Sequence, residues 1–136
     1  MRAQLHVQTC SEGGRNWSAA NLVQNVLVGQ GVQISNVKFN NQSGAIASNA
    51  IGTFTTGTVP TNLGLSEGIV IATGSITGSV CQNGTNVSNR AVAANQASTM
   101  HDATLAAALN IEPSNLIDCA VLEFDFIPSS DEVRFR

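Results

Sequence analysis

The sequence predicts a mainly β domain, a β-sandwich-like fold with two short helices. Residues 122–126 alternate strictly between apolar and acidic side chains, which is the period-two signature of a strand with one buried face. Residues 69–74 form a short continuous apolar run, which is typical of a strand buried on both faces. Gly- and Asn-rich turns separate such segments along the chain, as they do in sandwiches.

The composition limits the classes of function. A chain of 136 residues has room for one domain with a modest core. Charged residues make up only 11% of it, and Asn, Gln, Ser, Thr and Gly take their place, which favours a secreted or cell-surface protein. The net charge of −3 and the scattered basic residues argue against a nucleic-acid partner. No apolar run approaches the ~20 residues of a membrane span.

The N-terminal segment reads as an extended arm. Residues 4–10 alternate in polarity and predict a short strand, and Gly13-Gly14 separates them from the body of the chain. We therefore expect residues 1–12 to form an arm and residues 18–136 to form a β domain within one domain of 1–136. Residues 2–4 resemble the end of a processed signal, and an arbitrary start is the alternative.

The first helix is predicted at about residues 18–28. Ser18 suits its N-cap and Gly29 its C-terminal stop. Trp17 precedes it and is expected to pack against the sheet; the alternative is a surface position where it stacks on a ligand. One helical stripe carries the apolar side chains, namely Leu22, Val23, Val26 and Leu27.

Short strands follow the first helix. Residues 31–40 predict a strand with a register change at Asn36. Residues 45–46 and 51–55 predict short β segments, and residues 69–74 predict the fully buried strand.

The second helix follows a long polar excursion. Residues 75–97 are rich in Asn, Gly and Ser and are expected to lie outside the core. The Ala-rich stretch at about 99–110 predicts a helix capped by Ser98 or Thr99. Residues 112–115 end it.

The last stretch predicts one complete strand and the start of another. Pro128 ends the alternating strand, and residues 129–131 are turn formers. The alternation restarts at residues 133–135. We therefore expect an incomplete sheet at the C-terminus, with an open edge that is a template for a strand from another molecule.

The three cysteines, Cys10, Cys81 and Cys119, are an odd number. One interpretation is a single intramolecular disulfide with one leftover thiol, in which Cys81 pairs with either Cys119 or Cys10. The other is three small buried apolar residues.

No pattern of catalytic residues stands out. His101 and Asp102 with a serine would be the raw material of a triad, but adjacent helical residues point in different directions and no Gly-x-Ser-x-Gly elbow occurs. Glu123 and Asp125 share one strand face, which is interpreted as a solvated face, with Ca²⁺ contact as the alternative. We expect a protein that is not an enzyme, with no catalytic, cofactor-binding or metal residues and no cofactor.

Several segments in a fixed order and spacing carry a family resemblance. They are residues 21–32, 35–40, 52–54, 63–74 and 120–128. Together they closely resemble the choice-of-anchor L domain, over about residues 18–136.

The resemblance implies a place outside the cell. The family occurs in large secreted and surface proteins of bacteria, many of which carry a C-terminal sorting signal or another surface anchor, often for type IX secretion. In the family, the strand matching residues 133–135 continues into a Tyr/Phe-rich segment with paired acidic residues and further strands. The resemblance thus implies an N-terminal portion of the domain, and it transfers no catalytic or metal residues.

Two functions are therefore expected. One is an extracellular or cell-surface structural subunit that assembles by β-strand exchange into a fibre or sheath, with the N-terminal arm as the donated strand. The alternative is a monomeric adhesin domain of a larger secreted protein. The expected partners are copies of the chain, other surface proteins or carbohydrate.

Overall fold

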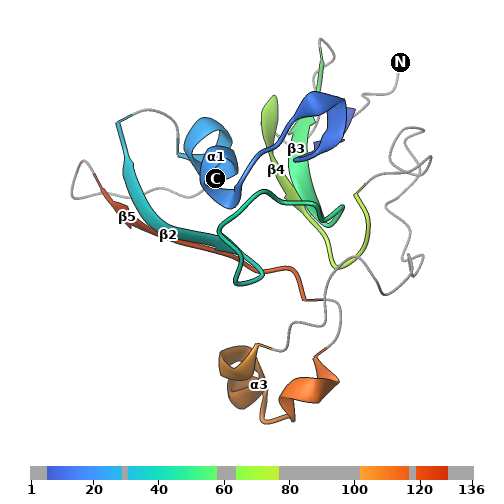
Figure 1. The fold of residues 1–136 in the computed structure, drawn as a ribbon, viewed down its shortest axis with the longest axis vertical. Helices are drawn as coiled ribbons and strands as arrows, with labels where there is room; N and C mark the ends of the chain where they lie inside the picture. The colour runs from blue at the N-terminus through green and yellow to red at the C-terminus, as the bar shows by residue number, and fades with distance from the viewer. Residues whose placement is uncertain (1–5, 29–30, 58–63, 77–101, 117–118, 129–136) are drawn as a thin grey trace.

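The computed structural model describes residues 6–28, 31–57, 64–76, 102–116 and 119–128 (Figure 1). These residues form two antiparallel sheets and two short helices, which confirms the mainly β prediction. One sheet has three strands in the order β1-β3-β4, and the other pairs β2 with β5. The strands are β1 (His6–Thr9), β2 (Gln33–Phe39), β3 (Ile51–Thr55), β4 (Glu67–Ile71) and β5 (Leu122–Ile127).

Strand β3 is the centre of the three-stranded sheet. It pairs with β1 in a register that places His6 opposite Thr55 and Thr9 opposite Gly52. The two backbones come so close at Gly52 that an added Cβ would collide with the carbonyl oxygen of Gln8. A residue without a side chain is needed there for β1 to lie against β3.

Strand β4 is less buried than predicted. The apolar run was expected to be covered on both faces, but β4 forms an edge of its sheet and pairs with β3 alone among the described strands. Its residues are half-buried or exposed, and Ile71 keeps 42% of its surface exposed. The prediction of a fully buried strand is therefore wrong, because a continuous apolar run does not reveal whether a strand is central or at an edge.

The two-stranded sheet confirms the alternation seen in the sequence. Along β5, Leu122, Phe124 and Phe126 are half-buried and the residues between them are exposed. The pairing with β2 shifts between Ser35 and Lys38, because Asn36 and Val37 together lie opposite one residue of β5. This bulge confirms the register change predicted at Asn36, which adopts a left-handed φ of 52°.

The first helix begins as predicted, with Ser18 as its N-cap. The Ser18 hydroxyl accepts a hydrogen bond from the Asn21 amide, and the Asn21 side chain accepts one from the Ser18 amide. The helix runs as α1 (Ala19–Leu22) and then widens into a π-turn, η2 (Val23–Leu27). The wider turn moves Leu27 off the apolar stripe, so Leu27 is 50% exposed where burial was predicted.

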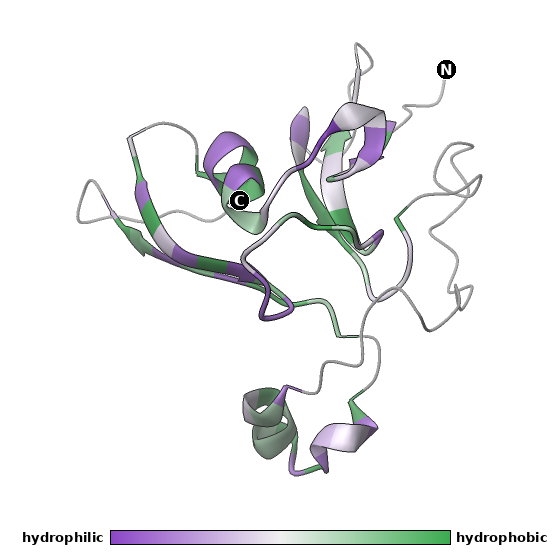
Figure 2. Cartoon of the chain, viewed as in Figure 1, coloured by the Kyte–Doolittle hydropathy of each residue, from purple (hydrophilic) through white to green (hydrophobic). Residues whose placement is uncertain are grey.

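The helix joins the two sheets. Figure 1 shows α1 over the β2–β5 pair and beside β3 and β4, and both α1–β2 and η2–β4 are in contact. Polar and apolar residues alternate along β2 in Figure 2, and its apolar residues Ile34, Val37 and Phe39 lie in or against the buried core. The buried core cluster comprises Cys10, Ala19, Leu22, Val23, Val37, Phe39, Ile46, Ala50 and Ile51.

The segments after β4 differ from the predictions at two points. Ile76 is 2% exposed, although residues 75–97 were predicted to lie outside the core, and its amide donates to the carbonyl of Asn49. The second helix, α3 (Ala103–Leu109), starts after Asp102, which caps it in place of the predicted Ser98 or Thr99. Those two residues, the remainder of 77–101 and the predicted strand start at 133–135 lie outside the described residues.

The shared helix generates a prediction for stability. Leu22→Ala should lower the free energy of unfolding by about 2–5 kcal/mol, because Leu22 is fully buried and its removal leaves a cavity between the sheets. Leu27→Ala, on the same helix, should cost less than about 1 kcal/mol. Denaturant unfolding followed by circular dichroism measures both, and equal losses would contradict this account of the core.

Candidate functional site

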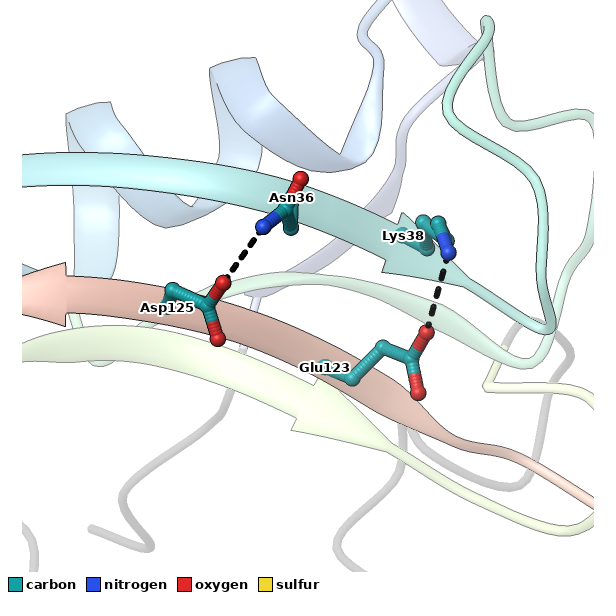
Figure 3. Close-up of polar contacts among 4 residues, drawn as sticks. All are labelled: Asn36, Lys38, Glu123 and Asp125. Atoms are coloured by element: carbon teal, nitrogen blue, oxygen red, sulfur yellow. Dashed lines mark hydrogen bonds and ion pairs between the residues drawn. The ribbon is translucent and has the colours of Figure 1, made fainter.

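The polar face of the two-stranded sheet carries the acidic residues singled out in the sequence. Glu123 and Asp125 both lie on the exposed face of β5, two residues apart. Across the sheet, Lys38 Nζ lies 3.7 Å from Glu123 Oε1. Asn36 Nδ2 donates to Asp125 Oδ2 at 2.5 Å (Figure 3). Each carboxylate therefore has its own partner on β2.

The bulge in β2 creates this arrangement. Asparagine tolerates the left-handed backbone that the bulge requires, and its short amide side chain reaches across to β5. Lys38 then lies directly opposite Glu123 in the register. Because the pair is about half exposed, it contributes no more than about 1 kcal/mol to stability.

The two carboxylates form a cross-strand ladder and do not converge on one point. In the part of the chain that the structure describes, no three His, Cys, Asp or Glu side chains gather as a metal ion would require. The geometry at Glu123 and Asp125 is that of a polar face that stabilises strand pairing.

A second polar contact, at Asn40, was missed in the sequence. The Asn40 side chain accepts a hydrogen bond from the Val121 amide at 2.9 Å and donates to the Cys119 carbonyl at 3.1 Å. The backbone amide of Asn40 also donates to the backbone carbonyl of Val121 at 2.9 Å. One residue at the end of β2 thus holds the backbone that leads into β5. The only sequence signal was an Asn pair after a strand, which reads as an ordinary turn.

Trp17, which was predicted to pack against the sheet, packs against the core cluster, which includes sheet residues such as Val37, Phe39 and Ile51. Its side chain is half-buried, and the Arg15 guanidinium carbon lies 4.5 Å from the ring centroid. Arg15 Nη1 also donates to Thr53 Oγ1 at 3.0 Å, which ties this stack to β3. A ligand that stacked on this face of Trp17 would have to displace Arg15.

Two of the three cysteines are free thiols. Cys10 and Cys119 are both buried and neither is in a disulfide, which fits the interpretation as small apolar residues. Cys81 lies outside the described residues. Burial raises the pKa of the Cys10 thiol above its ordinary value of 9.0, and the nearby Arg15 charge opposes this rise.

Asp102 has a local structural role. Its Oδ1 accepts a hydrogen bond from the Leu105 amide at 2.8 Å and so caps α3. His101, which together with Asp102 was considered for a triad and rejected, lies outside the described residues. His6 is exposed on β1, close to Gly57.

Comparison with known proteins identifies one family. The model of the choice-of-anchor L domain matches residues 8–136, which is nearly the whole chain. No curated protein and no solved structure matches the chain significantly. Among the described helices, none combines the length and the hydropathy needed to cross a membrane.

The Asn40 contact generates a prediction. Asn40→Ala should lower the free energy of unfolding by about 2 kcal/mol or more, because two backbone groups lose their partner. Asn41→Ala is the matched control, since Asn41 is exposed and also has a left-handed φ, so both variants carry the same backbone penalty. Chemical denaturation measures the difference; indistinguishable variants would show that the side-chain bonds contribute little.

The Cys10 thiol generates a pH prediction. Its folded-state pKa is raised, so the folded chain keeps a proton that the unfolded chain releases. The stability that this thiol contributes is therefore complete below pH 9.0 and lost as the pH rises towards the folded-state value, by at most about 1.4 kcal/mol per pH unit. Cys10→Ser does not titrate there. The stability difference between the two proteins should shrink above pH 9.0, and parallel pH curves would be inconsistent with this.

Proposed function

The chain belongs to the choice-of-anchor L domain family, and we propose that it is a non-catalytic structural module that associates with copies of itself by β-strand exchange. Membership of this family indicates a surface-associated protein module. The proposed place of action is the bacterial cell surface or the extracellular space. The proposed product of association is a fibre or sheath.

The observation that supports self-association is the character of the sheet edges. Within the described residues, the three-stranded sheet ends on β1 and β4, and each of these strands pairs on one side only. The outer side of an edge strand presents unpaired N–H and C=O groups, which form a template for a strand of another molecule.

These two edges carry little protection against pairing. Proteins usually guard an edge with lysine, proline or an inward-pointing charge. Glu67, at the start of β4, is the one charged residue in β1 and β4 together, and neither strand contains a proline. Ile71 at the other end of β4 exposes 42% of its surface. Low charge over the whole sequence also weakens repulsion between copies.

The alternative function is a monomeric adhesin domain that binds carbohydrate or another surface component. Trp17 is the residue most suited to stack on a sugar ring, and one of its faces lies against Arg15. The edges therefore support self-association better than any described side chain supports a carbohydrate site.

Sizing the purified chain tests the proposal. Light scattering after gel filtration should give masses above the 14.1 kDa of one chain, increasing with protein concentration. The association should persist at high salt, because backbone pairing and apolar contact are not screened. Electron microscopy of the heaviest fraction shows whether the product is a fibre. A mass of 14.1 kDa at every concentration would favour the adhesin alternative.

A further inference from the structure

We infer that β1 is the exchanged strand. In an assembly, β1 leaves the β3 of its own chain, and the side of β3 that it vacates, the acceptor edge, holds β1 of a second copy in the register seen within one chain. The inference rests on the proposed self-association and names its partner, a second copy of this chain. It further assigns the acceptor edge and the hinge.

The attachment of β1 can be reproduced by another molecule. Among the described strands, β1 pairs with β3 alone, over four residues. Thr9, the last residue of this pairing, and Cys10, which follows it, are 3% and 1% exposed and anchor the strand in the core. A second copy would supply the same strand and the same two buried side chains, so every one of these contacts would be kept.

The acceptor edge is shaped for a strand. At Gly52 the β3 backbone leaves no room for a Cβ, because the Gln8 carbonyl oxygen occupies that space. The same position lies against the Ile76 side chain, which is itself buried. The edge therefore fits a strand backbone closely at one defined point and fixes the register of whichever β1 is bound.

The segment after β1 has the properties of a hinge. It contains a short 3₁₀ turn, η1 (Glu12–Gly14), without a buried residue. Gly13 and Gly14 have φ angles of 66° and 77°, and the space beside Gly14 is empty. Glycine accepts both this left-handed form and an extended one, so the turn can straighten without a steric penalty.

Few bonds hold the hinge closed. The Trp17 amide donates to the Cys10 carbonyl at 3.1 Å, and the Arg15 amide donates to the Glu12 carbonyl at 3.2 Å. The Gln8 side-chain amide donates to the Glu12 backbone carbonyl, and the Thr9 backbone amide donates to the Glu12 carboxylate. Exchange breaks the bonds across the hinge and keeps the β1–β3 contacts, so the balance between the closed and exchanged forms depends mainly on the hinge and on concentration.

A cross-linking experiment on the full chain tests this inference. His6 and Thr55 are exposed and lie opposite each other in the β1–β3 pair. Opposite residues of an antiparallel pair are about 4.5–5.5 Å apart between Cα atoms, which suits a disulfide. The variants His6→Cys and Thr55→Cys are made separately, mixed at high concentration and oxidised. A disulfide between the two introduced thiols can then form only between two chains.

The expected result is a covalent dimer on a non-reducing gel, with the joined peptides identified by mass spectrometry. Adding Gly52→Ala to the Thr55→Cys chain should abolish the cross-link, because the acceptor edge no longer fits a strand. Gly44→Ala is the matched control, since nothing lies within 4 Å of a Cβ there, and it should leave the cross-link intact. A single chain that carries both His6→Cys and Thr55→Cys, oxidised at low concentration, should form the disulfide within one chain, and this result tests the register.

Each other outcome decides between the two proposals. Assemblies without the cross-link would show that association uses another edge, which overturns this inference and leaves the proposed function. A cross-linked dimer that does not grow into larger assemblies would support strand exchange and overturn the proposal of a fibre. A monomer without the cross-link would overturn both, and a dilute double variant that fails to close would overturn the register on which the inference depends.

Discussion

The register of β5 on β2 is the constraint on which the rest of the fold depends. A shift of one residue would turn Leu122 and Phe124 to solvent and their acidic neighbours into the core. Two asparagines with left-handed backbones resist such a shift. Asn36 forms the bulge and holds Asp125, and Asn40 binds the backbone of residues 119–121. These contacts join segments about eighty residues apart in the sequence. They place Leu122 and Phe124 of β5 against the core cluster, to which the helix contributes Ala19, Leu22 and Val23.

The sequence predicted those features whose cause is local. Strict alternation identified β5, the broken pattern at Asn36 identified the bulge, and Ser18 identified the start of the first helix. It failed where the cause was distant. Whether β4 is central or at an edge depends on which strands pair with it, and the burial of Ile76 depends on β3 and Asn49. The role of Asn40 depends on backbone groups near residue 120, which no local pattern around Asn40 could reveal.

The same distinction applies to the candidate site. The pairing of Glu123 and Asp125 on one face followed from period two, but their partners followed only from the register. Once Lys38 and Asn36 are opposite them, both carboxylates serve the sheet. The charged residues on this face thus contact residues of the neighbouring strand, and these contacts stabilise strand pairing. The edge strands of the other sheet, β1 and β4, contain one charged residue, Glu67, and this connects the low charge of the chain to the proposed self-association.

Gly52 is required both for the closed fold and for the proposed assembly. The close approach of Gln8 at this point allows the chain to bind its own first strand, and the same approach would bind the first strand of a neighbour. A larger residue at Gly52 would block both, so the chain cannot lose its acceptor edge and keep its closed form. Control of exchange must therefore lie elsewhere, in the hinge at Glu12–Gly14 and in the local concentration of chains. A protein displayed densely on a surface experiences a high local concentration, so the place of action proposed for this chain would itself favour the exchanged form.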